Sequence, residues 1–331
     1  MIGTGPSTAQ IAPQIQPIVK KLTLFQRSPT YIFPRRDTPI ERWKIWLFTL
    51  FPPALLCYHL YLYYLKEKSR PNQYSGTPEQ AMAAKVALAH LHRQVKDPVL
   101  IAKLTPNHEF GCKRPLVLDD YYPIFEKDNV ELITDKPVRI TEHSIISDPP
   151  SLLPKEVLDK EPDGAYDVPE IADDHKEKET EIDVLIWGTG FEMRDQGGNF
   201  QVYGIDGVNL HELWGETPEA YYGKVSCERT NFQGICVSQF PNLLIMFGPN
   251  AGAPWANLTT TFQTQAEYVA MQLRHLKREN SRKGKGPYAM MVEPGVQKRF
   301  NEWIQANMGP LAIVSPNCSN YYTVHLTFVV Y

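Results

Sequence analysis

The first 25 residues of the chain constrain its fold more than any other segment. Gly3 and Gly5 stand in a G-x-G spacing, and an apolar pattern of helical period follows over residues 9–21. A short apolar run over residues 22–25 then predicts a strand. A glycine turn that leads into a helix and then a strand is typical of one half of a dinucleotide-binding α/β fold.

This turn has the properties that a pyrophosphate site needs. Gly3 and Gly5 allow a tight turn and a close approach of the backbone, and the helix after Ser7 offers unpaired N–H groups to phosphate. Thr8 stands where the usual fingerprint has its third glycine. A G-x-G spacing alone is weak evidence, so the interpretation depends on the segments that follow.

Arg27 indicates which nicotinamide cofactor the chain would prefer. In NAD-binding folds an acidic residue about 20 residues beyond the glycines holds the ribose 2′-hydroxyl. Here Gln26 and Arg27 follow the strand instead, and a guanidinium suits a 2′-phosphate through charge-assisted hydrogen bonds. We therefore expect NADPH rather than NADH, with a plain surface arginine as the alternative.

Lys113 and Arg114 are adjacent cations ahead of Pro115. On an extended backbone their side chains point to opposite sides, so that one can bind phosphate while the other faces a reaction centre. A solvated pair in a loop is the alternative that composition alone favours.

An apolar run over residues 182–187 leads into a second glycine turn, Gly188-Thr189-Gly190. The run predicts a buried strand, and the small residues after it allow the backbone to approach a bound ligand closely. A strand that simply ends in a glycine turn is the alternative.

Residues 45–65 carry no formal charge and have the length of a transmembrane helix. Pro52 and Pro53 interrupt the stretch, and basic residues flank both of its ends, so the charges give no orientation. We expect two short helices, buried or partly exposed, that break at the prolines. Docking on a membrane surface and a true span are the alternatives.

Composition and charge bound the remaining functions. The 331 residues are 43% hydrophobic, enough for a sizeable core and typical of about two domains. With 34 basic and 37 acidic residues the net charge is −3, and we expect no nucleic-acid partner. Cysteine and histidine spacings suit no metal site, and no secretory signal is evident, so we expect no metal and a cytoplasmic location.

In order along the chain, these segments resemble the flavin-dependent monooxygenases of the Baeyer–Villiger type, which are similar in turn to the flavin-containing monooxygenases. Each piece is weak, but the ordered set is specific and covers nearly the whole chain. The pieces are Gly3-Thr4-Gly5-Pro6-Ser7, Phe25-Gln26-Arg27-Ser28-Pro29, Phe110-Gly111-Cys112-Lys113-Arg114-Pro115, Asp119-Asp120-Tyr121-Tyr122-Pro123, Gly188-Thr189-Gly190 and Gly248-Pro249-Asn250.

The resemblance implies an enzyme that reduces bound FAD with NADPH and transfers one oxygen atom from O2 to a small organic substrate. The reaction is either insertion beside a ketone or oxidation of a heteroatom. Arg114 matches the family's catalytic arginine, which stabilises negative charge, and Gly188 stands where the family usually has alanine. The cofactor-binding positions that match are Gly3, Thr4, Gly5 and Ser7 for pyrophosphate, Arg27 and Lys113 for the 2′-phosphate, Gly188, Thr189 and Gly190 at the crossing between domains, and Asn250 near the flavin.

The fold class implied is α/β. A Rossmann-like NADP-binding domain with a truncated first strand covers 1–36 and 111–187, a helical insertion or lid covers 37–110, and a C-terminal remnant of the FAD-binding domain covers 188–331. The lid makes membrane association through 45–65 the less favoured interpretation.

The family's N-terminal FAD-binding half and its hallmark histidine segment do not occur in the sequence. We therefore expect a truncated monooxygenase that is weakly active or inactive as written. A non-catalytic NADP-binding fragment is the main alternative. A disulfide reductase would need a redox cysteine pair, which the sequence lacks.

Overall fold

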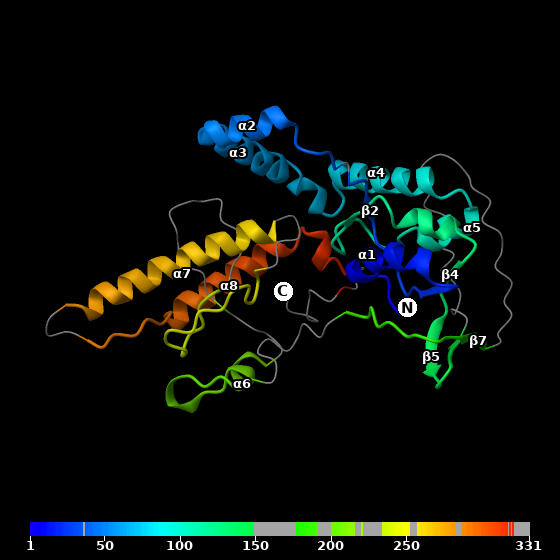
Figure 1. The fold of residues 1–331 in the computed structure, drawn as a ribbon. Helices are drawn as coiled ribbons and strands as arrows, with labels where there is room; N and C mark the ends of the chain where they lie inside the picture. The colour runs from blue at the N-terminus through cyan, green and yellow to red at the C-terminus, as the bar shows by residue number, and fades with distance from the viewer. Residues whose placement is uncertain are drawn as a thin grey trace. The chain divides into compact units, whose positions relative to one another are not determined.

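The structure is a computed structural model (Figure 1), and packing divides it into two compact units. The first comprises residues 1–50 and 76–191, and the second comprises residues 51–75 and 192–331. The domain bounds expected above differ from this division and stay a prediction. The structure describes residues 1–35, 37–148, 177–190, 200–215, 220, 234–251, 257–282, 286–316, 318 and 320.

A parallel sheet organises the first unit. β1 (Leu22–Phe25) pairs in parallel with β4 (Val130–Ile133), while Ile2 bridges β1 on one side and Trp187 on the other, both in parallel. α1 (Pro6–Ile15) connects Ile2 to β1. The spatial order is therefore β4, β1, Ile2 and Trp187, which is the arrangement of one half of a doubly wound fold. The predicted strand at 22–25 is confirmed, and the predicted helix is confirmed over its first half.

Ile2 joins the two sides of this sheet through its backbone. Its N–H donates to the carbonyl of Ile186 at 3.0 Å, and its carbonyl accepts from the N–H of Gly188 at 2.8 Å. The strand predicted over 182–187 is wrong, because only Trp187 pairs there, and Val184 and Trp187 are exposed. Ile2 is the partner of that segment in the sheet, and one bridge does not order a full strand.

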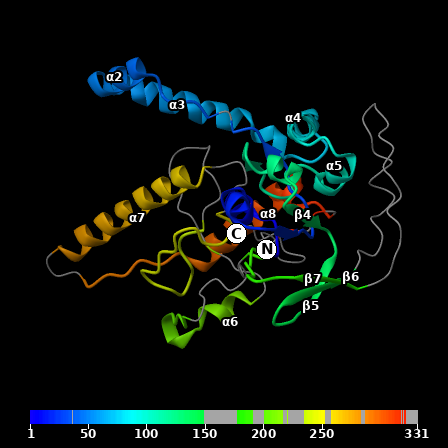
Figure 2. The same ribbon diagram turned by 45° about the vertical axis from the view of Figure 1, so that its right-hand side comes forward.

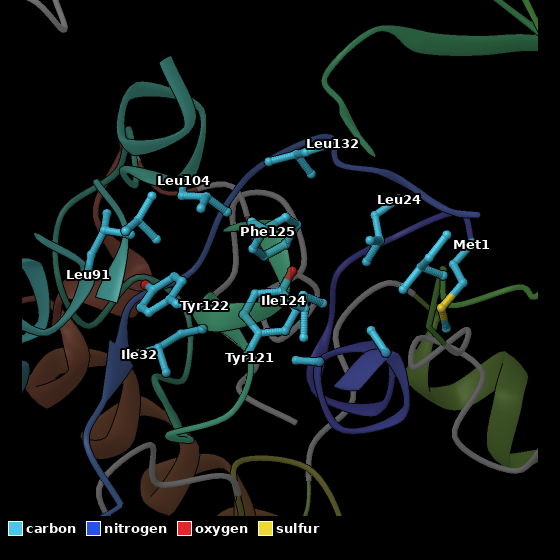
Figure 3. Packing of buried hydrophobic residues seen from close by; sticks show 14 residues of the cluster. Met1, Leu24, Ile32, Leu91, Leu104, Tyr121, Tyr122, Ile124, Phe125 and Leu132 are labelled. Carbon is cyan, nitrogen blue, oxygen red and sulfur yellow. The ribbon is translucent and has the colours of Figure 1, made fainter. Parts of the chain in front are cut away.

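The core of the first unit fills the space between the sheet and its helices (Figure 3). Leu24 comes from β1 and Leu91 from α4 (Pro78–Gln94), and both side chains are fully buried. Tyr121 and Tyr122 belong to the same cluster, and burial raises the pKa of both phenols. Their segment therefore contributes to the core, and the burial of each aromatic side chain stabilises the folded state by about 2 kcal/mol.

The remaining elements of the first unit lie around this core. Two more strands pair in parallel, and three form an antiparallel sheet (Figure 2). The elements are β2 (Ile32–Phe33) with β3 (Leu116–Val117), β5 (Lys136–Ile140) with β6 (Ser144–Asp148) and β7 (Lys178–Glu181), the helices α2 (Arg42–Leu50) and α5 (Pro98–Leu104), and the 3₁₀ turns η1 (Gln16–Ile18) and η3 (Tyr122–Glu126).

The second unit is largely helical in its described residues. Ile235 and Tyr268 form a buried cluster against which Phe300 packs, and this cluster joins α7 (Leu258–Asn280) to α8 (Pro294–Met308). Residues 243–247 form no strand, and Leu244 alone makes an isolated bridge, to Cys236. The other elements are α3 (Pro52–Lys68), η2 (Arg70–Gln73), η5 (Ile205–Gly207), α6 (Leu210–Trp214) and η6 (Ala312–Val314).

Prolines start helices in this chain more than they break them. α1, α3, α4, α5 and α8 each carry a proline in the first turn, where its missing N–H costs nothing. Thr77 completes the start of α4, because its side chain accepts from the N–H of Gln80 at 3.2 Å. The proline at residue 52 likewise begins α3 directly after α2 ends, as predicted.

α2 and α3 differ from the other helices in their exposure. None of their residues, all of which the structure describes, is buried, so the two helices that break at the prolines are exposed rather than buried, the second of the two alternatives expected for them. Within the described residues, no single helix has the length and apolar character to cross a membrane. α2 and the stretch over 52–73 meet those criteria of length and composition only as a bent pair.

Candidate functional site

Two glycine turns meet at the carboxyl edge of the parallel sheet. Residues 3–5 follow Ile2 and residues 188–190 follow Trp187, and these strand positions are neighbours. Gly3 has φ +93°, and a Cβ there would collide with the carbonyl oxygen of Gly188. Two segments at opposite ends of the unit's sequence thus form one backbone surface, on which only glycine fits at residue 3.

Thr8 explains why residue 188 is glycine. The Thr8 side chain is buried on the first turn of α1, and a Cβ on Gly188 would occupy the position of its Oγ1 atom. In the usual fingerprint the third glycine lets the helix pack closely on its strand. Here Thr8 fills that space from the helix, and Gly188 leaves room for it from the neighbouring strand.

The start of α1 offers N–H groups to an anion. Gly5 is the N-cap residue, no side chain caps the helix, and Ser7 is exposed on the first turn. Pro6 lacks an N–H, so the N–H groups of Ser7 and Thr8 are those that helix geometry leaves unpaired. Together with the positive end of the helix dipole they suit a pyrophosphate.

Arg27, Ser28 and Lys113 form a cationic cluster after β1. Lys113 donates from Nζ to the hydroxyl of Ser28 at 2.5 Å, and burial and then the charge of Arg27 lower the pKa of Lys113. Gln26 anchors the turn, since its buried side chain donates to the carbonyl of Lys103 at 2.7 Å. Two positive charges close together at a partly buried site repel each other, and an anion bound between them would relieve that repulsion.

His108 lies close to this cluster and was missed by the sequence reasoning, because no spacing marks it. Its ring makes an edge contact with Tyr31 at 5.6 Å between centroids, and the Tyr31 hydroxyl donates to its carbonyl at 3.0 Å. Neither ring nitrogen has a hydrogen-bond partner, although both are buried. Burial, reinforced by Lys113 and opposed by Glu109, lowers the pKa of His108 to about 4. The imidazole is therefore neutral near pH 7.

His108 should make the protein sensitive to acid. Between pH 6.5 and about 4, the His108 imidazole is protonated in the unfolded chain but not in the folded one. The free energy of unfolding therefore falls as the pH falls through this range. Residue 108 as a whole is half-buried, although its two ring nitrogens are covered. We therefore expect a loss on the order of 2 kcal/mol, which is less than 1.36 kcal/mol for each unit of the pKa shift would give. His108→Phe should lose correspondingly less in urea titrations across this range, whereas His275→Phe, at an exposed site on α7, should behave as the parent. Equal acid sensitivity of the parent and His108→Phe would contradict the prediction.

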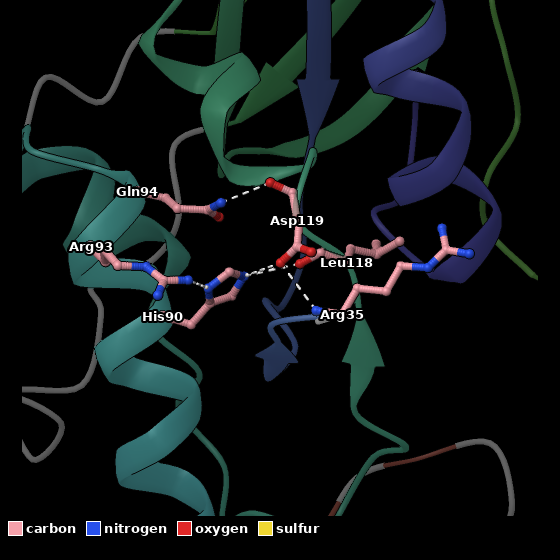
Figure 4. A network of polar contacts seen from close by, with 6 residues as sticks. All are labelled: Arg35, His90, Arg93, Gln94, Leu118 and Asp119. Carbon is pink, nitrogen blue, oxygen red and sulfur yellow. Dashed lines mark hydrogen bonds and ion pairs between the residues drawn. The ribbon is translucent and has the colours of Figure 1, made fainter. Parts of the chain in front are cut away.

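A second polar network holds the chain at Leu118 and Asp119, just beyond β3 (Figure 4). His90 is buried on α4, and its Nε2 atom lies 2.9 Å from the carbonyl of Leu118, just beyond β3. Asp119 accepts from the backbone N–H of Arg35 at 3.0 Å. Arg114 is exposed, and among the described residues no carboxylate pairs with its guanidinium. The network fixes the backbone at Leu118 and Asp119, four and five residues after Arg114.

Asn250 lies in the second unit, in a buried polar cluster. Its φ is +63°, and its amide donates to Oδ1 of Asn301 on α8 at 3.1 Å. Asn301 in turn donates to the carbonyl of Gln297 at 2.8 Å. The structure thus gives Asn250 a packing role, and its expected place near a flavin stays a prediction.

Comparison of the sequence with known proteins identifies relatives of this chain. No protein-family profile matches the chain. The chain is 32% identical over 327 residues to the FAD-binding monooxygenase BOA2 of Botryotinia fuckeliana, and 30% identical over 323 residues to a Baeyer–Villiger monooxygenase of Pseudomonas aeruginosa. The chain is related to the Baeyer–Villiger monooxygenases. The resemblance inferred from the ordered segments is thereby confirmed.

These alignments cover 97% of the chain, but 54% and 53% of the two relatives, so the chain spans about half the length of the curated Baeyer–Villiger relatives that it matches. Among solved structures, a complex of OTEMO with FAD and NADP gives a TM-score of 0.72 at 21% identity, over 100% of this chain and 61% of that one. An oxidized steroid monooxygenase bound to NADP gives 0.68 at 20% identity, over 97% and 60%. At these identities the likeness shows the mixed α/β fold of Baeyer–Villiger monooxygenases.

Proposed function

We propose that the chain carries the NADPH-binding part of a FAD-dependent monooxygenase. The reaction transfers one oxygen atom from O2 to a small organic substrate, by insertion beside a ketone or by oxidation of a heteroatom. The observation that carries the proposal is the cluster of Arg27, Ser28 and Lys113 at the same sheet edge as the two glycine turns. Cations there, in place of an acidic residue, favour a 2′-phosphate.

The residues of the first unit fit NADPH in two places. Arg27 and Lys113 neutralise the 2′-phosphate, with the Ser28 hydroxyl holding the Lys113 ammonium in position. Gly3, Thr4 and Gly5 bring the backbone against the pyrophosphate, and the N–H group of Ser7 binds it at the start of α1. When bound, NADPH supplies a hydride, and the protein binds and orients the cofactor.

Arg114 is the proposed catalytic residue. It directly follows Lys113 in the chain, it is exposed, and no described carboxylate pairs with its guanidinium. An arginine stays protonated at any pH of interest, so it can stabilise the negative charge that develops on oxygen. FAD is proposed from the relatives alone, with Gly188, Thr189, Gly190 and Asn250 as positions expected near it.

The proposal is tested by cofactor binding to the purified chain. We expect calorimetry to give at least a tenfold lower Kd for NADP+ than for NAD+, and equal Kd values would contradict the NADPH assignment. Added FAD should give a protein-bound flavin spectrum that NADPH bleaches without oxygen and air restores. Tight NADP+ binding with no flavin spectrum would support the alternative, a non-catalytic NADP-binding chain.

A further inference from the structure

α3 exposes apolar side chains on every side. Residues 60–65, three leucines and three tyrosines, are all between 40% and 61% exposed. Because an α-helix has 3.6 residues per turn, six consecutive exposed residues encircle it completely. Leu55 and Leu56 extend this surface toward the start of the helix, and α2 likewise contains no buried residue.

Such a surface is unusual for a helix in water. A helix on the surface of a soluble protein normally has one apolar stripe and one polar face. α7 in the same unit buries one face, at Thr261, Gln265 and Tyr268, and carries charged side chains such as Arg274 and Lys277 elsewhere. α3 has no polar face between Pro52 and Leu65. Large exposed apolar surfaces of this kind mark protein or membrane contacts.

The charges beside the apolar surface favour an anionic lipid surface. Residues 41–70 carry five basic side chains at the two ends of the apolar stretch and two acidic ones, Glu41 and Glu67, so their net charge is +3. Glu41 pairs with Lys44 at 3.2 Å, and the positive excess lies mainly at the end of α3, at Lys66, Lys68 and Arg70. Basic residues next to an apolar segment are attracted to acidic headgroups by about 1 kcal/mol each. Trp43 and Trp46 on α2 are 59% and 67% exposed, and tryptophan prefers the headgroup level of a bilayer.

Among the described residues, no single helix has the length and apolar character of a membrane span. α2 has 9 residues and α3 has 17, whereas a straight crossing of the hydrocarbon core needs about 20. Helices of this composition instead lie in the interface, with apolar side chains at the boundary between headgroups and acyl chains. Lys66 and Lys68 can keep their ammonium groups in water while their stems follow the apolar surface.

We propose that residues 42–68 dock the protein on the surface of an anionic lipid bilayer. The proposal is independent of the function proposed above, since none of these residues belongs to the NADPH site. The partner is a bilayer with acidic headgroups, and α3 supplies most of the apolar contact.

Vesicle sedimentation tests the proposal on the full chain. The protein should pellet with vesicles of phosphatidylcholine containing about 30% phosphatidylserine and much less with phosphatidylcholine alone, and raised salt should release part of it. The variant Leu56→Glu with Leu60→Glu should lower the partition coefficient at least tenfold. Its matched control, Met271→Glu with Leu273→Glu, changes two residues of α7 with similar exposure and should bind vesicles as the parent does.

Two outcomes overturn the proposal. In the first, the α3 variant and the α7 variant pellet equally with anionic vesicles. In the second, the parent ignores vesicles but self-associates, and the α3 variant is monomeric, so that a second copy covers α3 rather than lipid. Unchanged NADP+ affinity of the α3 variant checks its folding and separates this test from that of the proposed function.

Discussion

Replacing Arg27 and Lys113 together with glutamine should weaken NADP+ binding about a hundredfold and leave NAD+ binding nearly unchanged. Each cation makes a charge-assisted contact with the 2′-phosphate, worth about 1.5–3 kcal/mol, and a tenfold change in Kd corresponds to about 1.4 kcal/mol. Since Arg27 is exposed, we take the lower end of that range for each contact. NAD+ lacks the 2′-phosphate and should not respond.

The same double variant should be slightly more heat-stable than the parent when no nucleotide is bound. In the parent, the charge of Arg27 and burial both disfavour the Lys113 ammonium, which is the direction of its pKa shift. Removing the repulsion between the two cations should therefore raise the free energy of unfolding. Binding sites often reduce the stability of a protein in this way. A destabilised double variant would mean that its loss of binding reflects damaged folding.

Calorimetry with both nucleotides measures the effect, and a second pair of lysines provides the control. Lys20 precedes β1 and Lys127 precedes β4, so both lie at the amino edge of the parallel sheet, opposite the glycine turns. Lys20→Gln with Lys127→Gln removes the same net charge and should leave the Kd of NADP+ within about twofold. Equal losses in the two double variants would indicate a general charge effect and refute the site.

Gly188→Ala should lower the free energy of unfolding by about 2 kcal/mol, and Thr8→Ala in the same chain should restore most of it. The added Cβ would occupy the position of the Thr8 Oγ1 atom, and overpacking in a tight core costs about 1–3 kcal/mol. Thr8→Ala removes the obstructing atom, together with a buried hydroxyl that has no hydrogen-bond partner. The two changes should therefore be strongly non-additive.

Urea denaturation of the four chains in this cycle measures the coupling energy. Gly5→Ala is the matched control, since it adds the same methyl group to the neighbouring turn, where φ is −70° and the nearest atom, the carbonyl oxygen of Gly188, is 3.9 Å away. It should cost about 0.5–1 kcal/mol, because alanine is less favourable than glycine at an N-cap, and therefore less than Gly188→Ala. If Gly188→Ala were no worse than Gly5→Ala, the packing explanation would fail.

Local pattern was enough to predict several elements and site residues of this protein. The glycine turn, the first half of α1 and β1 follow from turn chemistry, from an apolar pattern of helical period and from a short apolar run, all of which act within a few residues. The break before Pro52 follows from the covalent geometry of proline. The choice of Arg27 and Lys113 came from charge in its local context, and the structure brings the two side chains together.

The features that local pattern could not predict depend on residues distant in the chain. Residues 182–187 read as a strand, but strand formation needs a paired neighbour along its whole length, and only Trp187 has one. His108 is buried by Tyr31 and its neighbourhood, which no spacing in the sequence reveals. The exposure of α3 is another such feature, because the same apolar pattern occurs in helices that contact protein and in helices that contact lipid.

The chemical groups at the proposed site and their order along the chain are therefore determined by the sequence, because charge and backbone propensity are properties of single residues and short segments. The meeting of Gly3 with Gly188, the packing of Thr8 into the space above Gly188 and the approach of Lys113 to Arg27 arise only on folding. They depend on which strands become neighbours and in which register, and register is set by packing between segments that lie far apart in the chain.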